Sequence, residues 1–356
     1  MAMKEKKSAS TGGGRVLIVE LWRFVFSLGI ISWHYLWHNY GIDLGLYITV
    51  DIFLILSGFL MYRQLSRRNF SYEGAWAITW KRAAGMWPVY AFGCFSVLVS
   101  QCLFRDAMGL GGLIRELLYG IPEFFYLTYT GNGVAWYVQR MLVAGLLVMF
   151  LLCVNRKAYI CCIAPLGIWF LYWTMFQKLG GIQNFDSYTF TPLIQDTQFR
   201  ALAGLMLGTT AAALLEHIQS AGPTPTGKLL QRRGNLLGCM GITLGLSLMM
   251  VKQYGLFELI SIAIFFFSVV GLFGGTDFSK ALAPYEKPIG YLGGLSFSLY
   301  INQYTFDWIA LPYGPVASLA VILAVNLIYA VVTRWLIERF CAFLKRKTAA
   351  AIHALS

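Results

Sequence analysis

Ionisable side chains interrupt the first apolar segment of the chain. Glu20 and Arg23 lie near its start, and His34 and His38 lie near its end. On an α-helix, the step from Arg23 to His34 returns to within about 20° of the same face, about 16 Å further along the axis. Glu20, Ser27 and His38 fall within about 60° of that line. The spacing therefore predicts one polar stripe along a helix whose other faces are apolar.

Such a stripe is typical of a site that moves protons or holds anions. Ionisable residues at membrane depth cost several kcal/mol, so they normally face a bundle interior or a wet cavity. Asp51 comes close to the depth of His34 if consecutive helices are antiparallel, and a carboxylate that orients an imidazole makes a general base. Two structural alternatives stay open. Glu20 and Arg23 can form an ion pair below a histidine that caps the helix, and Asp51 can simply neutralise a histidine.

The composition indicates the fold that must position these residues. Of 356 residues, 58% are hydrophobic and only 12% are charged, and apolar runs of about 20 residues recur along the chain. We therefore predict an all-α, polytopic integral membrane protein. Ten spans are expected, at 16–38, 43–62, 84–104, 133–154, 158–177, 196–216, 235–251, 256–274, 289–311 and 315–341. Between the third and fourth, 113–129 is expected to be amphipathic or re-entrant.

The basic residues predict the topology. Most of the 28 Lys and Arg residues fall in loops on the same side as the amino terminus, so both termini are expected to be cytosolic. Residues 1–15 are predicted to be a disordered cytosolic leader, 16–341 a single transmembrane domain and 342–356 a basic cytosolic tail. The net charge of +12 follows from this asymmetry and does not indicate nucleic-acid binding. Seven cysteines without metal-ligand spacing predict neither a disulfide framework nor a metal site.

Further polar residues cluster on each predicted side. The loop 62–82 carries five cations, including Lys81 and Arg82, which could hold an anionic ligand or attract anionic lipid. On the other side lie Trp136, Arg140, Tyr300, Gln303 and Asp307. Aromatic residues at this depth are often interfacial belt residues, whereas Arg140 and Asp307 could pair with each other.

Several segments in order resemble the acyltransferase-3 family of bacterial membrane-bound O-acyltransferases. Arg23 and His34 match the signature of its first helix, and Val50 to Leu60 is similar to its second-helix pattern. The blocks that begin at Lys81, Ala135 and Phe199 resemble later family blocks. So do those that begin at Leu292 and Ile337. Together they cover nearly the whole chain.

The resemblance implies acyl transfer from cytosolic acyl-coenzyme A, most simply acetyl-CoA, to a sugar hydroxyl of a surface glycan or lipid-linked sugar near the outer leaflet. His34, oriented by Asp51, would then be the catalytic base. Cofactor binding would fall to Arg23, Lys81, Arg82 and Ser57. Substrate binding would fall to His38, Trp136, Arg140, Tyr300 and Gln303.

Two positions depart from the family pattern. Gly85 stands where a second arginine is common, so Lys81 is the candidate substitute. Gln303 stands where a histidine is common, and an amide cannot exchange a proton near neutral pH. A transporter or flippase of a small or lipid-linked substrate, using the same polar stripe, is therefore the alternative function. A third alternative is a non-catalytic partner subunit. In either setting the expected location is the cell membrane, in contact with membrane lipids.

Overall fold

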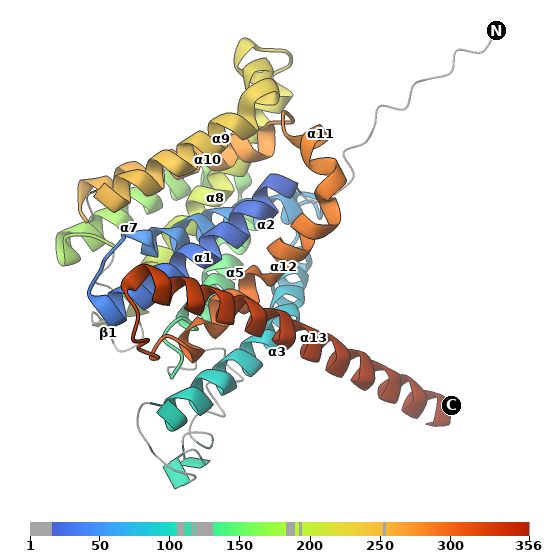
Figure 1. The fold of residues 1–356 in the computed structure, drawn as a ribbon. Coiled ribbons are helices and arrows are strands. Elements are labelled where there is room, and N and C mark those ends of the chain that lie inside the picture. Colours follow the sequence, from blue (N-terminus) through green and yellow to red (C-terminus); the bar gives the residue numbers. More distant parts are fainter. Residues whose placement is uncertain are drawn as a thin grey trace.

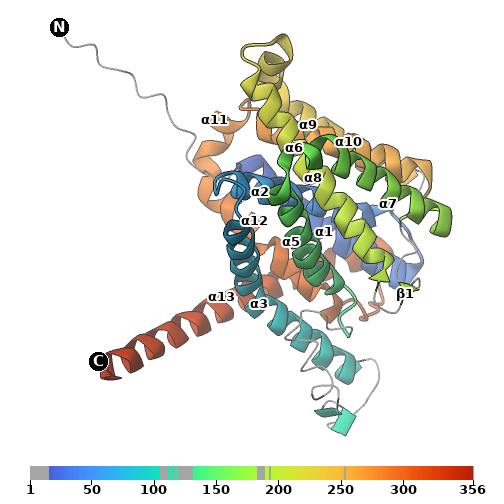
Figure 2. The same cartoon turned by 180° about the vertical axis from the view of Figure 1, so that it is seen from behind.

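The described part of the chain folds into a bundle of α-helices (Figures 1 and 2). The computed structural model describes residues 16–104, 111–112, 114–115, 118, 131–182, 189–191, 194–251 and 254–355. The long helices are α1 (Leu17–Tyr40), α2 (Thr49–Ser66), α3 (Tyr72–Phe104), α5 (Trp136–Val154), α7 (Ala164–Leu179), α8 (Asp196–Ser220), α9 (Pro225–Val251), α10 (Leu256–Gly274), α12 (Glu286–Asn302) and α13 (Pro315–Leu355).

Short elements connect these helices. They are η1 (Leu46–Ile48), α6 (Arg156–Ala158), the π-helical turn η2 (Tyr159–Ile163), α11 (Ser279–Leu282), η4 (Ala283–Tyr285) and η5 (Gln303–Thr305). The strands β1 (Thr189–Thr191) and β2 (Ile194–Gln195) form a two-stranded antiparallel ribbon in which Thr189 pairs with Gln195. The helices otherwise account for the architecture, and the prediction of an all-α fold is confirmed.

Nine helices in the described residues are long and apolar enough to cross a membrane, which makes this a multi-pass membrane protein. The predicted span at 289–311 is not among these nine helices. Helix α12 has 17 residues, and η5 follows it directly. Helix α12 is mostly buried among its neighbours, so its role is to supply polar partners inside the bundle.

Several boundaries differ from the sequence prediction. Helix α3 begins at Tyr72, so most of the predicted loop 62–82 is helical and places Lys81 and Arg82 on a helix face. Helix α9 begins at Pro225, because proline is tolerated in the first turn, where its missing N–H has no helical partner. Helix α13 continues to Leu355 through the predicted tail and extends beyond the bundle (Figure 1). The predicted element 113–129 lies almost entirely outside the described residues.

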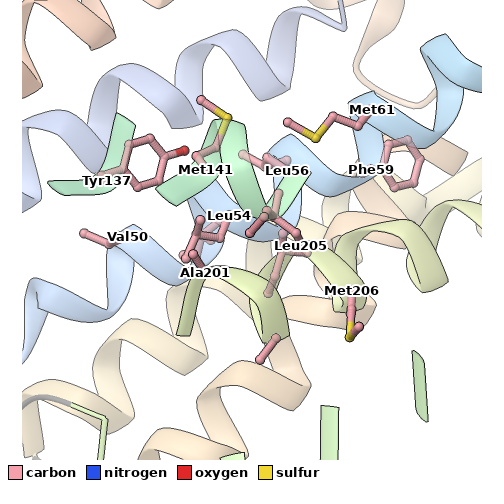
Figure 3. Packing of buried hydrophobic residues seen from close by; sticks show 14 of the residues in the cluster. Val50, Leu54, Leu56, Phe59, Met61, Tyr137, Met141, Ala201, Leu205 and Met206 are labelled. Carbon is pink, nitrogen blue, oxygen red and sulfur yellow. The ribbon is translucent and has the colours of Figure 1, made fainter. Parts of the chain in front are cut away.

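Helix α2 forms the centre of the core and packs closely on α8. Figure 3 shows Leu54, Leu56 and Phe59 of α2 beside Leu205 and Met206 of α8. Glycines make this approach possible. A Cβ atom added to Gly208 would lie 2.0 Å from the carbonyl oxygen of Ile55, and one added to Gly58 would lie 2.2 Å from that of Leu205. The helices are therefore in backbone contact, as small residues allow inside membranes.

A buried ion pair joins the same two helices. Arg200 on α8 donates from Nε to Asp51 Oδ1 at 3.1 Å and from Nη2 to Asp51 Oδ2 at 2.6 Å. The Nη2 atom also donates to the carbonyl oxygen of Tyr47 at 3.1 Å. The two side chains are 1% and 0% exposed. Because every donor and acceptor is inside the protein, the pair fixes how α8 is placed against α2.

Tyr47 connects this ion pair to a second buried acid, Glu258. The hydroxyl of Tyr47 donates to Glu258 Oε1 at 2.5 Å, and the N–H of Ile182 donates to Glu258 Oε2 at 3.0 Å. Glu258 lies in the first turn of α10, where an acidic residue is favoured by the helix dipole, so its sequence position gave no sign of this network. Elements η1, α2, α8 and α10 are therefore held together at one end of the bundle.

Replacement of Gly208 by alanine should destabilise the bundle by about 1–3 kcal/mol, because the new methyl group overlaps the backbone of α2. Gly85→Ala is the matched control. It adds the same methyl group where nothing lies within 4 Å, and alanine is the better helix former by about 1 kcal/mol. Thermal unfolding in detergent checks both variants. Equal effects at the two positions would contradict the close packing of α2 on α8.

Loss of one partner of the buried ion pair should destabilise the protein by about 3–5 kcal/mol, because the other charge is left uncompensated. We expect this for Asp51→Leu and for Arg200→Met. The double variant should be more stable than the sum of the two effects predicts, since neither Asp51 nor Arg200 is left without its partner. Denaturant titration of all four forms measures the coupling. Additive single effects would show that the pair does not act as a unit.

Candidate active site

The polar stripe of α1 faces α12. At its first end, Glu20 lies against Gly293, where an added Cβ would be 2.1 Å from Glu20 Oε2. In its middle, the hydroxyl of Ser27 donates to the carbonyl oxygen of Ser296 at 3.0 Å. Two residues of the predicted stripe, Glu20 and Ser27, therefore contact α12.

His34 meets a tyrosine from the turn that follows α12. The hydroxyl of Tyr304 lies 3.2 Å from His34 Nδ1, and the two rings meet edge to face with centroids 5.0 Å apart. Gly133 makes room for this ring, because a Cβ there would lie 2.6 Å from Tyr304 Cε2. Since either partner can donate, the tyrosine can hold the imidazole with the hydrogen on Nδ1 and the lone pair on Nε2.

His38 has a carboxylate partner. Its Nδ1 atom is hydrogen-bonded to Oδ2 of Asp307, a residue that is only 3% exposed. Trp308 stacks on the His38 ring at 5.6 Å with an interplanar angle of 10°, and the rings of His34 and His38 are 5.6 Å apart. The structure therefore places two imidazoles side by side, one held by a phenol and the other by a carboxylate.

Hydrogen bonds from the last turns of α1 hold the segment that carries Tyr304 and Asp307. Asn39 Nδ2 donates to the carbonyl oxygen of Asp307 at 2.8 Å. The hydroxyl of Tyr35 donates to the carbonyl oxygen of Ile309 at 3.3 Å. The site is therefore built from α1 and from the chain after α12.

Two predicted pairings are wrong. Asp51 does not orient His34, because both of its carboxylate oxygens accept hydrogen bonds from Arg200. Asp307 does not pair with Arg140, because Asp307 binds His38, and Arg140 Nε donates to Thr197 Oγ1 at 2.7 Å. Both predictions matched residues by depth, whereas the rotation of each helix about its axis decides which neighbours a side chain meets.

Tyr137 lies among the predicted cofactor-binding residues. Its hydroxyl is 3.3 Å from the Ser57 hydroxyl, and it is close enough to Arg23 and Arg82 to interact with both charges. Arg23 also forms the Glu20 ion pair, at 3.0 Å, that was the structural alternative. Lys81, one position along α3 from the half-buried Arg82, is exposed. Arg82 lies near enough to Arg23 for the two charges to interact.

The predicted substrate-binding residues divide into two groups. The hydroxyl of Tyr300 donates to the carbonyl oxygen of Val134 at 3.0 Å. Gln303 Nε2 donates to the backbone carbonyl oxygen of Tyr300 at 2.9 Å. The Oε1 atom of Gln303 has no hydrogen-bond partner in the described part of the chain. By contrast, the ring of Trp136 lies 5.9 Å from Arg200 Cζ, and Arg140 donates a hydrogen bond to Thr197 on α8. Tyr300 lies in the last turn of α12 and Gln303 in η5, beside Tyr304, whereas Trp136 and Arg140 contact α8.

Asp43 links α1 to the loop before α10, close to the histidines. Its carboxylate accepts from Trp33 Nε1 at 2.7 Å and from the Tyr254 hydroxyl at 2.8 Å. Burial first, and then the hydrogen bond and negative charge of Asp43, raise the pKa of Tyr254 to about 12. The tyrosine therefore stays protonated near neutral pH and keeps donating.

The arrangement suits acid and base chemistry. Two neighbouring imidazoles, each with an oriented Nδ1, can accept and return protons at Nε2. In the part of the chain that the structure describes, no group of three or more His, Cys, Asp or Glu residues could hold a metal ion.

Comparison with known proteins identifies a family. The profile of a family described as an acyltransferase domain matches residues 16–338, nearly the whole chain. No curated protein and no solved structure is significantly similar to this chain. The match includes Arg23, both histidines and the whole of α12. The protein therefore belongs to the acyltransferase-3 family and is a multi-pass membrane acyltransferase.

Proposed function

We propose that the protein is an O-acyltransferase that moves an acyl group, in the simplest case acetyl, from acyl-coenzyme A to a sugar hydroxyl. The acceptor would be a surface glycan or a lipid-linked sugar. The family supplies the reaction class and favours an enzyme over a transporter. The observation that carries the proposal is the contact between His34 and Tyr304, beside the pair formed by His38 and Asp307.

In the proposed step, His34 acts as the general base. When Nδ1 donates to the oxygen of Tyr304, Nε2 is free to take the proton of the acceptor hydroxyl. The hydroxyl oxygen then attacks the thioester carbonyl, so that a C–O bond forms as the C–S bond breaks. The proton on His34 returns to the leaving thiolate, which gives coenzyme A and an ester.

The donor would be held at the other end of the stripe. Arg23 and Arg82 both lie near enough to Tyr137 for their charges to interact with it, and two guanidinium groups suit the phosphates of coenzyme A. Arg23 and His34 are separated by about 16 Å along α1, a gap that an extended pantetheine arm can cross. The charge asymmetry of the loops would put Arg23 on the cytosolic side of the cell membrane and His34 near the outer leaflet.

The acceptor would bind between the histidines and the segment after α12. His38 on α1, Tyr300 on α12 and Gln303 on η5 would line this region. The unpaired Oε1 of Gln303 suits a sugar hydroxyl, because a buried acceptor without a partner costs about 1–3 kcal/mol. Gln303 would thus bind the acceptor where many relatives have a histidine.

Replacement of His34 by glutamine should lower kcat by about 10²–10⁴, because it removes the base. Glutamine is polar and similar in size to histidine, so the packing is kept. Asp307→Asn should mainly raise KM for the acceptor, because His38 loses its orienting carboxylate. Release of coenzyme A from radiolabelled acetyl-coenzyme A, with label counted in a glycan and lipid extract, measures both.

The reverse pattern would make His38 the base. The asparagine variant would then lose kcat, while the His34 variant would keep it. Turnover that neither substitution changes would contradict catalysis at this site, and no turnover by the folded wild type would favour a non-catalytic subunit.

Removal of the Arg82 charge in Arg82→Gln should raise KM for acyl-coenzyme A about ten-fold or more with little change in kcat, because a charge-assisted hydrogen bond contributes about 1.5–3 kcal/mol. Arg232→Gln is the matched control, an exposed arginine on α9. Initial rates against donor concentration separate the two constants. An equal rise in the control would show that Arg82 acts only through the overall charge.

A further inference from the structure

A cavity of about 670 Å³ lies between η2, α8 and α10, away from the residues of the candidate active site. Its lining combines cations with apolar side chains. Arg156, Lys157 and His217 supply positive charge or N–H donors, and Ile160, Leu214 and Phe266 supply an apolar wall. The volume is within the range of about 300–1,000 Å³ that is usual for small-molecule sites.

The acid in the lining is already neutralised. Glu216 accepts from Arg156 Nη2 at 2.8 Å through one oxygen and from the Tyr62 hydroxyl at 2.8 Å through the other. Arg156 is held further by the ring of Phe70, 4.8 Å from its Cζ. The side chains of Lys157 and His217 make no hydrogen bond or ion pair within the described residues. These two groups are available to an anion.

The cavity borders a surface that suits lipid chains. On α7, Leu166, Trp169 and Phe170 are 65%, 63% and 57% exposed, and Phe267 on α10 is 64% exposed. Helices α7 and α10 both pack against α8, which lines the cavity. In a multi-pass membrane protein, such faces contact the bilayer. A ligand of this cavity can therefore arrive from the membrane.

A π-helical turn forms one wall. It spans Tyr159–Ile163 and is anchored to α8 by a 2.8 Å hydrogen bond between the hydroxyls of Tyr159 and Thr209. A π turn shifts the register of the residues on either side of it, and such turns are frequent at functional sites. Here it turns Ile160 and Cys161 toward the cavity.

We propose that this cavity binds one anionic glycerophospholipid from the surrounding bilayer. The headgroup phosphate accepts hydrogen bonds from Lys157 and His217, and an acyl chain lies along Ile160, Leu214 and Phe266. Charge complementarity selects an anionic lipid, since the one lining carboxylate is occupied. The apolar wall selects a lipid over a free phosphate. This site is independent of acyl transfer.

Native mass spectrometry of the full chain, released from micelles doped with phosphatidylglycerol or phosphatidylcholine, tests the proposal. Lys157→Gln should weaken phosphatidylglycerol binding about five-fold, the effect of one cation near a lipid surface, and His217→Gln should weaken it too. Lys228→Gln is the matched control, an exposed lysine on α9. Equal losses in the control, or equal binding of the two lipids by the wild type, would overturn the proposal.

Two adjacent cysteines give a second measurement that leaves the lining charges unchanged. Cys161 lines the cavity, whereas its exposed neighbour Cys162 is not part of the lining. In single-cysteine forms placed in nanodiscs, maleimide should label Cys161 more slowly in phosphatidylglycerol than in phosphatidylcholine, with Cys162 unaffected. Equal protection of both thiols would contradict a lipid in the cavity. So would protection of Cys161 by inorganic phosphate or coenzyme A in phosphatidylcholine.

Discussion

The structure around the histidines depends on the buried ion pair between Arg200 and Asp51. A charge without water must be compensated inside the protein, so α2 and α8 cannot slide or rotate without leaving both groups unpaired. The constraint reaches α1 through Tyr47, whose carbonyl oxygen binds Arg200 and whose ring lies 5.5 Å from Trp33. Trp33 directly precedes His34. An interaction without direct contact to the histidines thus helps to fix where α1 presents them.

Close packing at glycine residues also determines the geometry of the candidate site. Gly293 lets α12 pass Glu20, and Gly133 lets the ring of Tyr304 reach His34. Neither glycine carries chemistry, yet a side chain at either position would push apart the elements that do. The candidate active site is therefore the product of two kinds of constraint. Buried charges set the orientation of the helices, and small residues set how near they come.

The protein also separates its cationic groups by task. Arg23 and Arg82 both lie near Tyr137, where the proposed donor would bind. Lys157 and His217 line a cavity beside helices that expose large apolar side chains. Internal cations suit a soluble ligand that is handed to the histidines, whereas the peripheral ones suit a resident of the bilayer.

The sequence by itself determined what depends on local spacing. Apolar runs predicted the helices, the step between Arg23 and His34 predicted a single polar face, and the close spacing of Glu20 and Arg23 left open the ion pair that they form. Only the tertiary structure decided the partners across helices. Asp51 matched His34 in depth but binds Arg200, 149 positions away, and Asp307 binds His38 across 269 positions. Depth follows from the rise per residue, whereas rotation about each helix axis follows from the packing of the whole bundle.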